Sequence, residues 1–286
     1  MKSLAVLTYS KAPQLLSDDR LIIPLLRNNS VIATPVVWND GDVDWAAFDC
    51  LLFRSTWDYY LHVDSFSEWL EKTEGIGIQT INSISAVRWN MHKFYLRELQ
   101  LYGIIIIPTV FLNRNAMKNT TIELPENWEK VIIKPAVSAG SHETIIRNRN
   151  EIASDLSNLT YDLPDYDILI QEFMPEICTV GELSFIFFDR QFSHAVRKTP
   201  KAGDFRIQVQ FGGIYTTFQP SSDQLDAAYK VIAAIPYPIS YARVDGIWKD
   251  DVFYLMEVEL IEPDLYMGYA PEAATRFVSS ITNALF

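Results

Sequence analysis

The chain has few cysteines and histidines, and it lacks the spacings that zinc sites and disulfide frameworks use. Its 286 residues contain two cysteines, Cys50 and Cys178, and four histidines, with no CxxC pair. Neither a zinc site nor a disulfide-based fold is therefore indicated. Because unpaired cysteine side chains are usually buried, we expect two buried thiols in a reducing cytoplasm.

An excess of basic residues is also missing. Lysine and arginine number 24 against 36 aspartates and glutamates, and the formal net charge is −12. Nucleic acids and anionic membranes require broad basic surfaces, so we expect neither as a partner. No window approaches the roughly 18 uncharged apolar residues of a membrane span, and residues 1–10 lack the features of a signal peptide. A soluble, cytoplasmic protein is expected.

The first part of the chain has the pattern of a small α/β lobe. The composition of the whole chain, 49 % hydrophobic and 21 % charged, is that of an ordered globular protein, and the length of the whole chain predicts two or three lobes. Short apolar runs at residues 4–8, 31–37 and 50–53 alternate with segments that predict helices at 18–27 and 65–72. A further helix is predicted over residues 85–101, with Lys93 on it.

Strand patterns dominate the rest of the chain. Apolar runs predict strands at residues 104–107 and 131–133, followed by a helix at 151–159 and strands at 168–173, 183–188, 193–196 and 206–211. Residues 241–248 and 253–260 alternate with a period of two around a turn at 249–251, which predicts a β-hairpin. No repeat of fixed period is present.

The hairpin carries a candidate metal site. Glu257 and Glu259 must share a face, and an odd-length turn would add Asp245 and Arg243 to it, whereas an even turn would separate them. Three carboxylates beside one arginine repel one another unless a divalent cation lies among them, and magnesium prefers such oxygen ligands. The alternative is a polar face that is only solvated.

Two other segments are candidates for holding phosphate. Lys134 ends an apolar run and precedes a loop of small residues that includes Ser138 and Gly140, whose backbone N–H groups could approach phosphates closely. The sequence is not that of a P-loop. The second segment, residues 194–206, contains Arg197, Lys198, Lys201 and Arg206 against one aspartate. An ordinary hairpin and a solvated basic surface are the respective alternatives.

In this order, the segments resemble the ATP-grasp superfamily from residue 82 to the C-terminus, and they are similar to its glutathione synthetase and D-alanine:D-alanine ligase branches. The resemblance implies that Lys93 and Lys134 contact the nucleotide and that Ser138, Gly140 and their neighbours cover its phosphates. It further implies that an interlobe hinge contacts adenine through Gln171, Glu172 and Met174, and that Glu182 binds the ribose. The implied metal ligands are Asp245, Glu257 and Glu259, the last of which replaces the usual asparagine.

A narrower resemblance is to a subgroup that includes the cycloserine-forming ligase. It is carried by residues 54–59, 192–198 and 262–266, and it does not transfer a substrate. The fold that the resemblance implies is a mixed α/β (α+β) ATP-grasp fold with three lobes. These are an N-terminal small α/β lobe at residues 1–84, a central lid at 85–170 and a C-terminal antiparallel-sheet lobe with the metal site at 171–286.

The implied activity is that of an ADP-forming ligase. ATP, with Mg²⁺ or alternatively Mn²⁺, would convert a small-molecule carboxylate into an acyl phosphate, which an amine then attacks. Lys198, Arg206 and Arg243 are the candidate catalytic residues: the two arginines would stabilise charge on the transferring phosphoryl group, and Lys198 would hold phosphates. Arg54 either binds a substrate carboxylate or forms an interlobe ion pair. The rival functions are an inactive nucleotide-binding regulatory module and a phosphotransferase without ligation; a homodimer is expected.

Overall fold

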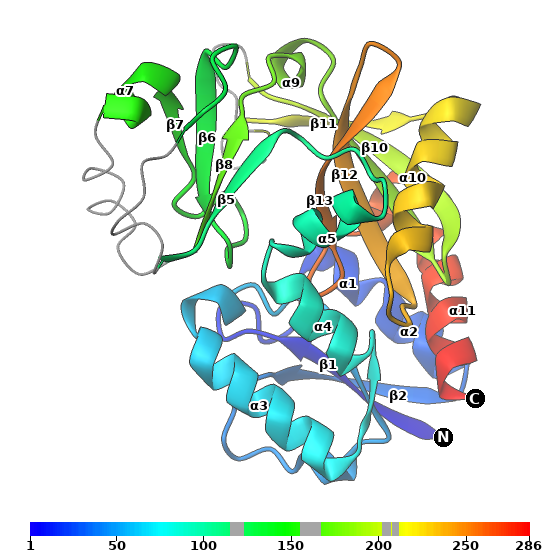
Figure 1. Cartoon of the computed structure of the whole chain (residues 1–286). Coiled ribbons are helices and arrows are strands. Elements are labelled where there is room, and N and C mark those ends of the chain that lie inside the picture. Colours follow the sequence, from blue (N-terminus) through cyan, green and yellow to red (C-terminus); the bar gives the residue numbers. More distant parts are fainter. Residues whose placement is uncertain (115–122, 155–166, 202–206, 208–211) are drawn as a thin grey trace.

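A computed structural model of the chain describes residues 1–114, 123–154, 167–201, 207 and 212–286 (Figure 1). The described residues form three sheets with helices around them, which confirms the predicted mixed α/β class.

The first sheet is parallel and belongs to the N-terminal part of the chain. Its strand order is β2-β1-β3-β4, and β1 and β3 are almost wholly buried, as expected for strands covered on both faces. Helices cross over between the parallel strands, as predicted from the alternating pattern. The strands are β1 (Lys2–Thr8), β2 (Val31–Val37), β3 (Cys50–Phe53) and β4 (Gln79–Ile81), and the helices are α1 (Ser17–Arg20), α2 (Ile22–Asn28) and α3 (Val63–Ile76).

The second sheet is antiparallel, in the order β5-β8-β6-β7, and it has a core of its own around Trp128, Val131 and Ile170. Its elements are β5 (Thr109–Leu112), β6 (Lys130–Pro135), β7 (Ile145–Asn148), α7 (Arg149–Ser154) and β8 (Ile168–Glu172). The strand predicted at residues 104–107 is wrong. Instead, Ile107 and Ile105 exchange backbone hydrogen bonds with Leu255 at the edge of the third sheet, and β5 begins after Pro108.

The third sheet is also antiparallel, in the order β11-β10-β9-β12-β13. Leu96 and Leu99 of α5 and Val231 of α10 pack in one core with its strands, while Phe277 of α11 stacks on Phe188 of β9. Its strands are β9 (Glu182–Phe188), β10 (Gln191–Thr199), β11 (Ile214–Phe218), β12 (Tyr241–Lys249) and β13 (Val252–Glu259). Helices α5 (Tyr95–Leu101), α9 (Glu176–Thr179), α10 (Ser222–Ala234) and α11 (Ala273–Leu285) complete this part, with a 3₁₀ turn at Met267–Tyr269. Two further 3₁₀ turns, at Trp45–Ala47 and Tyr59–Leu61, belong to the first sheet.

The helix predicted over residues 85–101 is two helices, α4 (Ile84–Met91) and α5, and Lys93 lies between them. The helix is interrupted where the backbone N–H of Lys93 donates to the carbonyl oxygen of Ala136, at 2.8 Å, in place of a helical partner. This bond joins the segment to the loop after β6. The prediction that Lys93 lies on a helix is therefore wrong, and the break directs its side chain toward the site.

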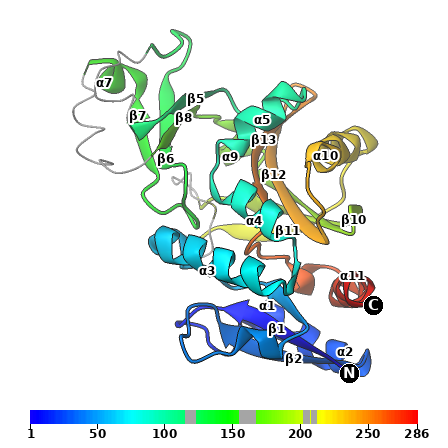
Figure 2. The same cartoon turned by 60° about the horizontal axis from the view of Figure 1, so that its bottom comes forward.

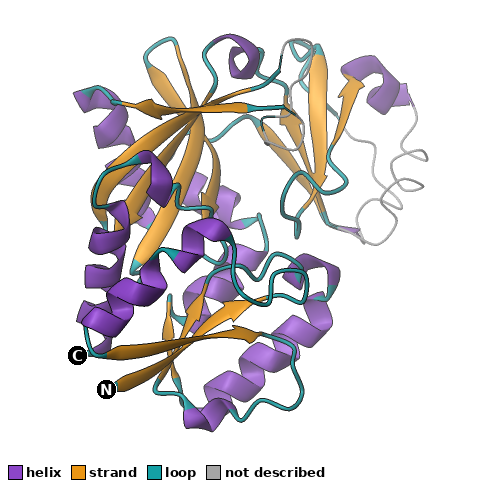
Figure 3. Cartoon of the chain, turned by 180° about the vertical axis from the view of Figure 1, so that it is seen from behind, coloured by secondary structure: helices purple, strands orange, loops and turns teal. Residues whose placement is uncertain are grey.

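The first and third sheets share one hydrophobic core, whereas the second sheet projects from them (Figures 1 and 2). Phe277 of α11 lies in this shared core with Leu4 and Ile22 on one side and Tyr241 on the other. The view from behind shows the second sheet and its helix standing apart from the other two layers (Figure 3). Strand β8 spans residue 170, so the predicted border between the second and third lobes falls inside a strand; the lobe limits remain a prediction.

The structure corrects one prediction about the cysteines. Cys50 is buried, but the side chain of Cys178 in α9 is exposed, and the two form no disulfide. Burial raises the pKa of the Cys50 thiol to about 12. Within the described residues, no helix combines the length and the apolar character needed to cross a membrane. The strand predicted at 206–211 and the end of the helix predicted at 151–159 fall largely outside the described residues.

Candidate active site

The β12–β13 hairpin brings its polar residues to one face through a β-bulge. The turn at Asp250 and Asp251 is even, because Lys249 pairs directly with Val252, and alone it would separate Asp245 from Glu257. Between Gly246–Leu255 and Asp245–Glu257 the register shifts by one residue, with Met256 as the extra residue. As a result Asp245 lies opposite Glu257, and Arg243 lies opposite Glu259.

The outer edge of β13 is fixed by side chains of the preceding helical segment. The side chain of Asn90 in α4 accepts a hydrogen bond from the backbone N–H of Leu260 and donates one to the carbonyl of Val258, both at 2.8 Å. The hydroxyl of Tyr95 in α5 both accepts from the Val258 N–H and donates to its carbonyl. Asn82 donates to the carbonyls of Tyr241 and Leu260 at 2.9 Å. These bonds pair an edge strand that would otherwise be open, and they hold Glu257 and Glu259 in place.

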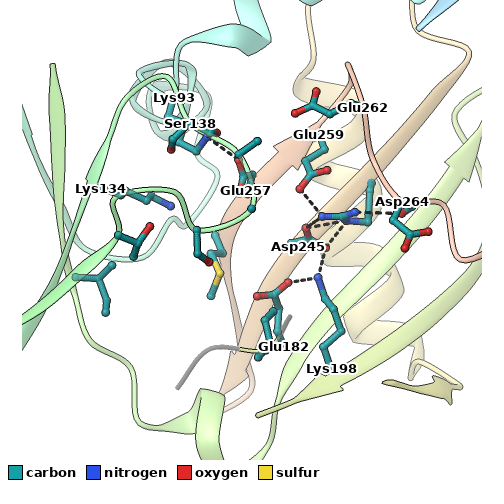
Figure 4. A pocket seen from close by; sticks show the side chains of 18 of the residues that line it. Lys93, Lys134, Ser138, Glu182, Lys198, Asp245, Glu257, Glu259, Glu262 and Asp264 are labelled. Carbon is teal, nitrogen blue, oxygen red and sulfur yellow. Dashed lines mark hydrogen bonds and ion pairs between the residues drawn. The ribbon is translucent and has the colours of Figure 1, made fainter. Parts of the chain in front are cut away.

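A cavity of about 570 Å³ opens between this hairpin and the second sheet, which belongs to the predicted lid. Its volume lies within the usual size range of ligand pockets. Most of the residues predicted to bind ligands line it, and several of them are seen in Figure 4. They are Lys93, Lys134, Ser138, Gly140, Gln171, Glu172, Met174, Glu182, Lys198, Arg243, Asp245, Glu257 and Glu259. The fold therefore gathers residues from four distant segments around one space.

The lid side of the cavity carries two lysines. Lys93 donates to the carbonyl of Ser138 and forms an ion pair with Glu257 at 3.0 Å. Lys134, at the end of β6, is 8 % exposed, and within the described part of the chain its amine has no hydrogen-bond or ion-pair partner. Burial, assisted by the positive charge of Lys93, lowers the pKa of Lys134 to about 8. A buried amine with no partner is suited to bind an anion that enters the cavity.

The hairpin side is a network of opposite charges centred on Asp245. Arg243 contacts the Asp245 carboxylate at 2.9 Å and also pairs with Glu259 and with the backbone carbonyl of Asp264. Lys198 pairs with Glu182 and lies 3.5 Å from Asp245. Burial by itself would raise the pKa of Asp245, but the cationic Arg243 and Lys198 outweigh it and lower that pKa. Burial raises the pKa of Glu182 despite the attraction of Lys198.

Glu257 and Glu259 lie in different electrostatic environments. Burial opposes ionisation of both, but Lys93 and Lys134 lower the pKa of Glu257. Burial raises the pKa of Glu259 to about 7, although Arg243 acts in the opposite direction. Among the described residues, no three acidic, histidine or cysteine side chains are close enough together to form a metal site. Asp245 and Glu257 instead pair with Arg243 and Lys93, respectively.

The apolar end of the cavity lies between the hinge and the hairpin. Ile107, Met174 and Ile247 pack together there and line the cavity. The backbone N–H of Glu172 donates to the Pro108 carbonyl and that of Phe173 to the Lys130 carbonyl, both at 3.0 Å. These two donors are therefore engaged within the sheet. Met174 is the hinge residue that remains a candidate for contact with an adenine edge.

Arg54 lies away from this cavity. Its guanidinium is 2 % exposed, donates to Asp19 and to the Pro263 carbonyl at 2.8 Å, and lies over the rings of Tyr241 and Phe277. It lines a separate cavity of about 170 Å³ together with Asp18 and Asp19. The ion pair of Arg54 with Asp19 lies within the N-terminal lobe, and only the hydrogen bond to the Pro263 carbonyl crosses to the C-terminal lobe. The predicted catalytic residue Arg206 lies outside the described residues.

The sequence reasoning missed the N-terminal wall of the cavity. Tyr9 and Lys11 follow β1, and Asp58 and Tyr60 follow β3. Ligands commonly bind at the carboxyl ends of parallel strands, so the two strand ends were a usable signal. Trp57 also lines the cavity, whereas Tyr59 is buried in the core of the first sheet. Glu262 also lines the cavity, and no role had been predicted for it.

Known proteins support the fold over the full length. The family model described as "D-cycloserine synthetase DcsG, N-terminal domain" matches residues 4–82. The chain is 25 % identical to "Cycloserine biosynthesis protein DcsG" of Streptomyces lavendulae over 100 % of its own length and 99 % of that protein. A glutathione synthetase of Prochlorococcus marinus (strain MIT 9313) is 26 % identical over 59 % of this chain and 52 % of that one.

Two solved structures show the same fold. The crystal structure of D-cycloserine synthetase DcsG superposes with a TM-score of 0.84 at 24 % identity, covering 99 % of this chain and 100 % of that one. A D-alanine–D-alanine ligase from Bacillus anthracis complexed with ATP superposes with a TM-score of 0.67 at 17 % identity, covering 100 % of this chain and 97 % of that one. In sequence and fold the chain is thus similar to ATP-dependent carboxylate–amine ligases of the ATP-grasp superfamily.

Proposed function

We propose that the chain uses ATP and magnesium to activate a small-molecule carboxylate as an acyl phosphate, which an amine then attacks to form a C–N bond and release ADP and phosphate. The observation that carries this proposal is the position of Lys134. Its buried amine, without a partner among the described residues, faces the cavity across from the carboxylates of the hairpin. Phosphates of ATP would neutralise the lysine, and a magnesium ion bound to those phosphates would neutralise the carboxylates.

The residues of the cavity divide into roles. Met174 and its apolar neighbours would contact adenine, Glu182 would accept hydrogen bonds from the ribose, and Lys93 and Lys134 would bind phosphates beneath the loop with Ser138 and Gly140. Lys198 and Arg243 would stabilise charge on the transferring phosphoryl group. We give Arg206 the same role on the basis of the sequence resemblance alone.

Asp245, Glu257 and Glu259 fit a magnesium ion chemically, since all are carboxylates, and an ion held by phosphates needs only one or two of them. Magnesium would supply charge neutralisation at the phosphates when bound. The ion pairs of Asp245 with Arg243 and of Glu257 with Lys93 would then be exchanged for contacts to metal and phosphate. Mn²⁺ is the alternative ion, and substitution of one ion for the other in a turnover assay would compare them.

The test is the melting temperature of the protein with Mg²⁺ and ATP together, with each alone, and with GTP. A ligand of the native state at about 100 times its dissociation constant stabilises by roughly 2.7 kcal/mol. We expect a shift that needs both components and is lost in Lys134→Ala and Glu257→Ala, but kept in the exposed control Glu71→Ala on α3. No shift at saturating ATP would contradict nucleotide binding.

ADP release separates the remaining functions. A ligase needs both a carboxylate and an amine for steady release, a phosphotransferase needs no amine, and a regulatory module binds ATP without release. Screening small carboxylates with and without amines therefore distinguishes the three. We also propose a cytoplasmic homodimer, and light scattering on the purified protein would test its subunit count.

A further inference from the structure

Two of the buried charged side chains that line the cavity stand apart from the others. Arg243, Asp245, Lys198, Glu182 and Lys93 each take part in an ion pair. Lys134 and Glu262, both 8 % exposed, have no ion pair and no side-chain hydrogen bond within the described residues. Burying an unpartnered ionic group costs free energy, and an incoming ligand of opposite charge offsets that cost.

Lys134 and Glu262 therefore call for different ligand groups. Lys134 belongs to the lid side and is accounted for by phosphate. Glu262 lies at the far end of the hairpin side, beyond Glu259 (Figure 4). Burial and the neighbouring carboxylate of Glu259 raise the pKa of Glu262, so its ionised form is stabilised by a positive group placed against it, and a cation is the ligand that it would favour.

The position of Glu262 is fixed by its neighbours. The indole N–H of Trp57 donates to the Glu262 backbone carbonyl at 2.9 Å, and the next carbonyl, that of Pro263, accepts from Arg54 at 2.8 Å. Ile261, which precedes Glu262, is buried in the core of the first sheet. The segment is thus held between two lobes, which fixes the carboxylate before any ligand arrives.

The surroundings of Glu262 favour an organic cation. The rings of Tyr9, Trp57 and Tyr60 line the same cavity, and Tyr9 and Trp57 are in contact, with ring centroids 6.4 Å apart. Aromatic faces attract ammonium groups, and they add to the attraction of a carboxylate. Lys11 is also on the cavity wall, but its side chain is exposed and forms no ion pair with Glu262 in the described structure.

We propose that Glu262, with the aromatic wall of Tyr9, Trp57 and Tyr60, forms a subsite that binds the ammonium group of a substrate. This inference rests on the proposed function, because it names the chemical class of the molecule that lies beside the nucleotide. The ammonium belongs either to the acid that is activated, which is then an amino acid, or to the separate amine that attacks. The two sources share one chemistry and are told apart below.

The experiment compares amino acids with matched acids that lack the amino group. Alanine and propionate, aspartate and succinate, and glutamate and glutarate, with both configurations of each amino acid, are tested for thermal stabilisation without nucleotide and for ADP release with Mg²⁺ and ATP. Methylamine is added to parallel samples as a simple amine. Each set is run on the wild type, on Glu262→Gln, on Glu262→Asp and on the control Glu71→Gln, an exposed glutamate of α3 that does not line the cavity.

We expect Glu262→Gln to lower kcat/KM for the ammonium-bearing substrate by about tenfold to a hundredfold, which is the loss of one charge-assisted hydrogen bond. If the source is the activated acid, only amino acids support ADP release in the wild type, and the preference over the matched acids falls toward one in Glu262→Gln. If the source is the separate amine, the variant raises KM for methylamine and leaves that for the acid unchanged. Glu71→Gln should match the wild type throughout.

Other results would overturn the inference. Unchanged discrimination in Glu262→Gln, or a change confined to its Mg²⁺ dependence, would make Glu262 a structural residue or part of the metal site. A wild type that binds none of the amino acids or amines would also overturn it. Loss of folding in Glu262→Gln is detected by its melting curve. In that case Glu262→Asp, which keeps the charge, is compared with the wild type in the same assays. Absence of a Mg²⁺–ATP shift contradicts the proposed function separately, since amino acid binding is measured without nucleotide.

Discussion

Asp245 and Glu257 lie directly opposite each other on β12 and β13 because a β-bulge at Met256 shifts the register by one residue. With the two-residue turn of this hairpin, a regular pairing would place them on opposite faces. The carboxylates of the site are therefore brought together by one extra residue in one strand. Bulges near active sites commonly redirect side chains in this way.

The bulge depends on close packing at Gly246, which leads to the first prediction. A Cβ at this position would lie 2.4 Å from the Phe253 ring and 2.6 Å from the Tyr254 carbonyl oxygen. We expect Gly246→Ala to lower the free energy of unfolding by about 1–3 kcal/mol, the usual cost of overpacking. Urea unfolding measures this loss.

The matched control for this substitution is Gly75→Ala. Gly75 lies in α3, and a Cβ there would have no atom within 4 Å. Alanine is favoured over glycine inside helices by about 1 kcal/mol, so this variant should be as stable as the wild type or more stable. Equal stability of the two variants would contradict the packing argument at Gly246.

The sequence predicted most elements but not the connections that build the site. The strands β2 and β3 match their apolar runs, since periodicity reports burial directly. The break at Lys93 could not be predicted, because it depends on a hydrogen bond to Ala136, which is distant in the sequence. The bulge at Met256 likewise follows from pairing between strands. Tertiary contacts, rather than local patterns, decide both.

The roles of Arg54 and Glu262 could not be predicted from the sequence either. Both readings of Arg54 were chemically reasonable, and only the positions of Asp19 and the Pro263 carbonyl distinguish them. Glu262 was part of a sequence resemblance, but its lack of an ion-pair partner among the described residues depends on how the neighbouring charged groups pair. Whether a charged side chain has a partner is a property of the folded cavity.

The second prediction concerns Lys134→Met. Removing the amine should weaken ATP binding by about tenfold to a hundredfold, since a hydrogen bond to a charged group contributes roughly 1.5–3 kcal/mol. Without nucleotide, the same variant should be at least as stable as the wild type, because the buried amine has no partner among the described residues. Calorimetric titration and urea unfolding measure the two effects. A large loss of stability without ligand would show that the amine has a structural role.

The third prediction is a pH dependence of nucleotide binding. Burial, then the charge of Lys93, lowers the pKa of Lys134 to about 8, and ATP requires its protonated form. Affinity contributed by this amine should thus be constant well below pH 8 and should decrease above it, by up to tenfold per pH unit. Arginine stays protonated throughout this range, so Lys134→Arg should remove the decrease. The same steep fall in Lys134→Arg would assign the effect to another group.

The lowered pKa of Lys134 also has a consequence for stability. The ordinary lysine pKa of 10.5 exceeds the pKa of about 8 in the folded protein, so the unfolded chain binds more protons between these two pH values. The contribution of this group to the free energy of unfolding should therefore rise as pH increases from about 8 toward 10.5. Comparison of the wild type with Lys134→Met at each pH isolates it, because the other titrating groups are common to both.

The fourth prediction decides between the two readings of Arg54. Arg54→Met would leave Asp19, which is 3 % exposed, as an unpaired buried carboxylate and would remove a donor from the Pro263 carbonyl. Breaking one partner of a buried ion pair typically costs about 3–5 kcal/mol, so we expect a loss of that size in urea unfolding. The double variant Arg54→Met with Asp19→Asn should recover part of it, since the unpaired charge is then gone.

The double variant also separates stability from substrate binding. If Arg54 serves only to join the lobes, a refolded double variant should keep the wild-type KM for the carboxylate once an active acid is known. If Arg54 binds the substrate carboxylate, KM should rise by about tenfold or more even where stability is recovered, because a bidentate guanidinium contact is lost. The buried ion pair with Asp19 favours the first result, because it already balances the charge of the guanidinium, whereas Nη1, which has no hydrogen-bond partner among the described residues, is the nitrogen that a substrate would have to reach.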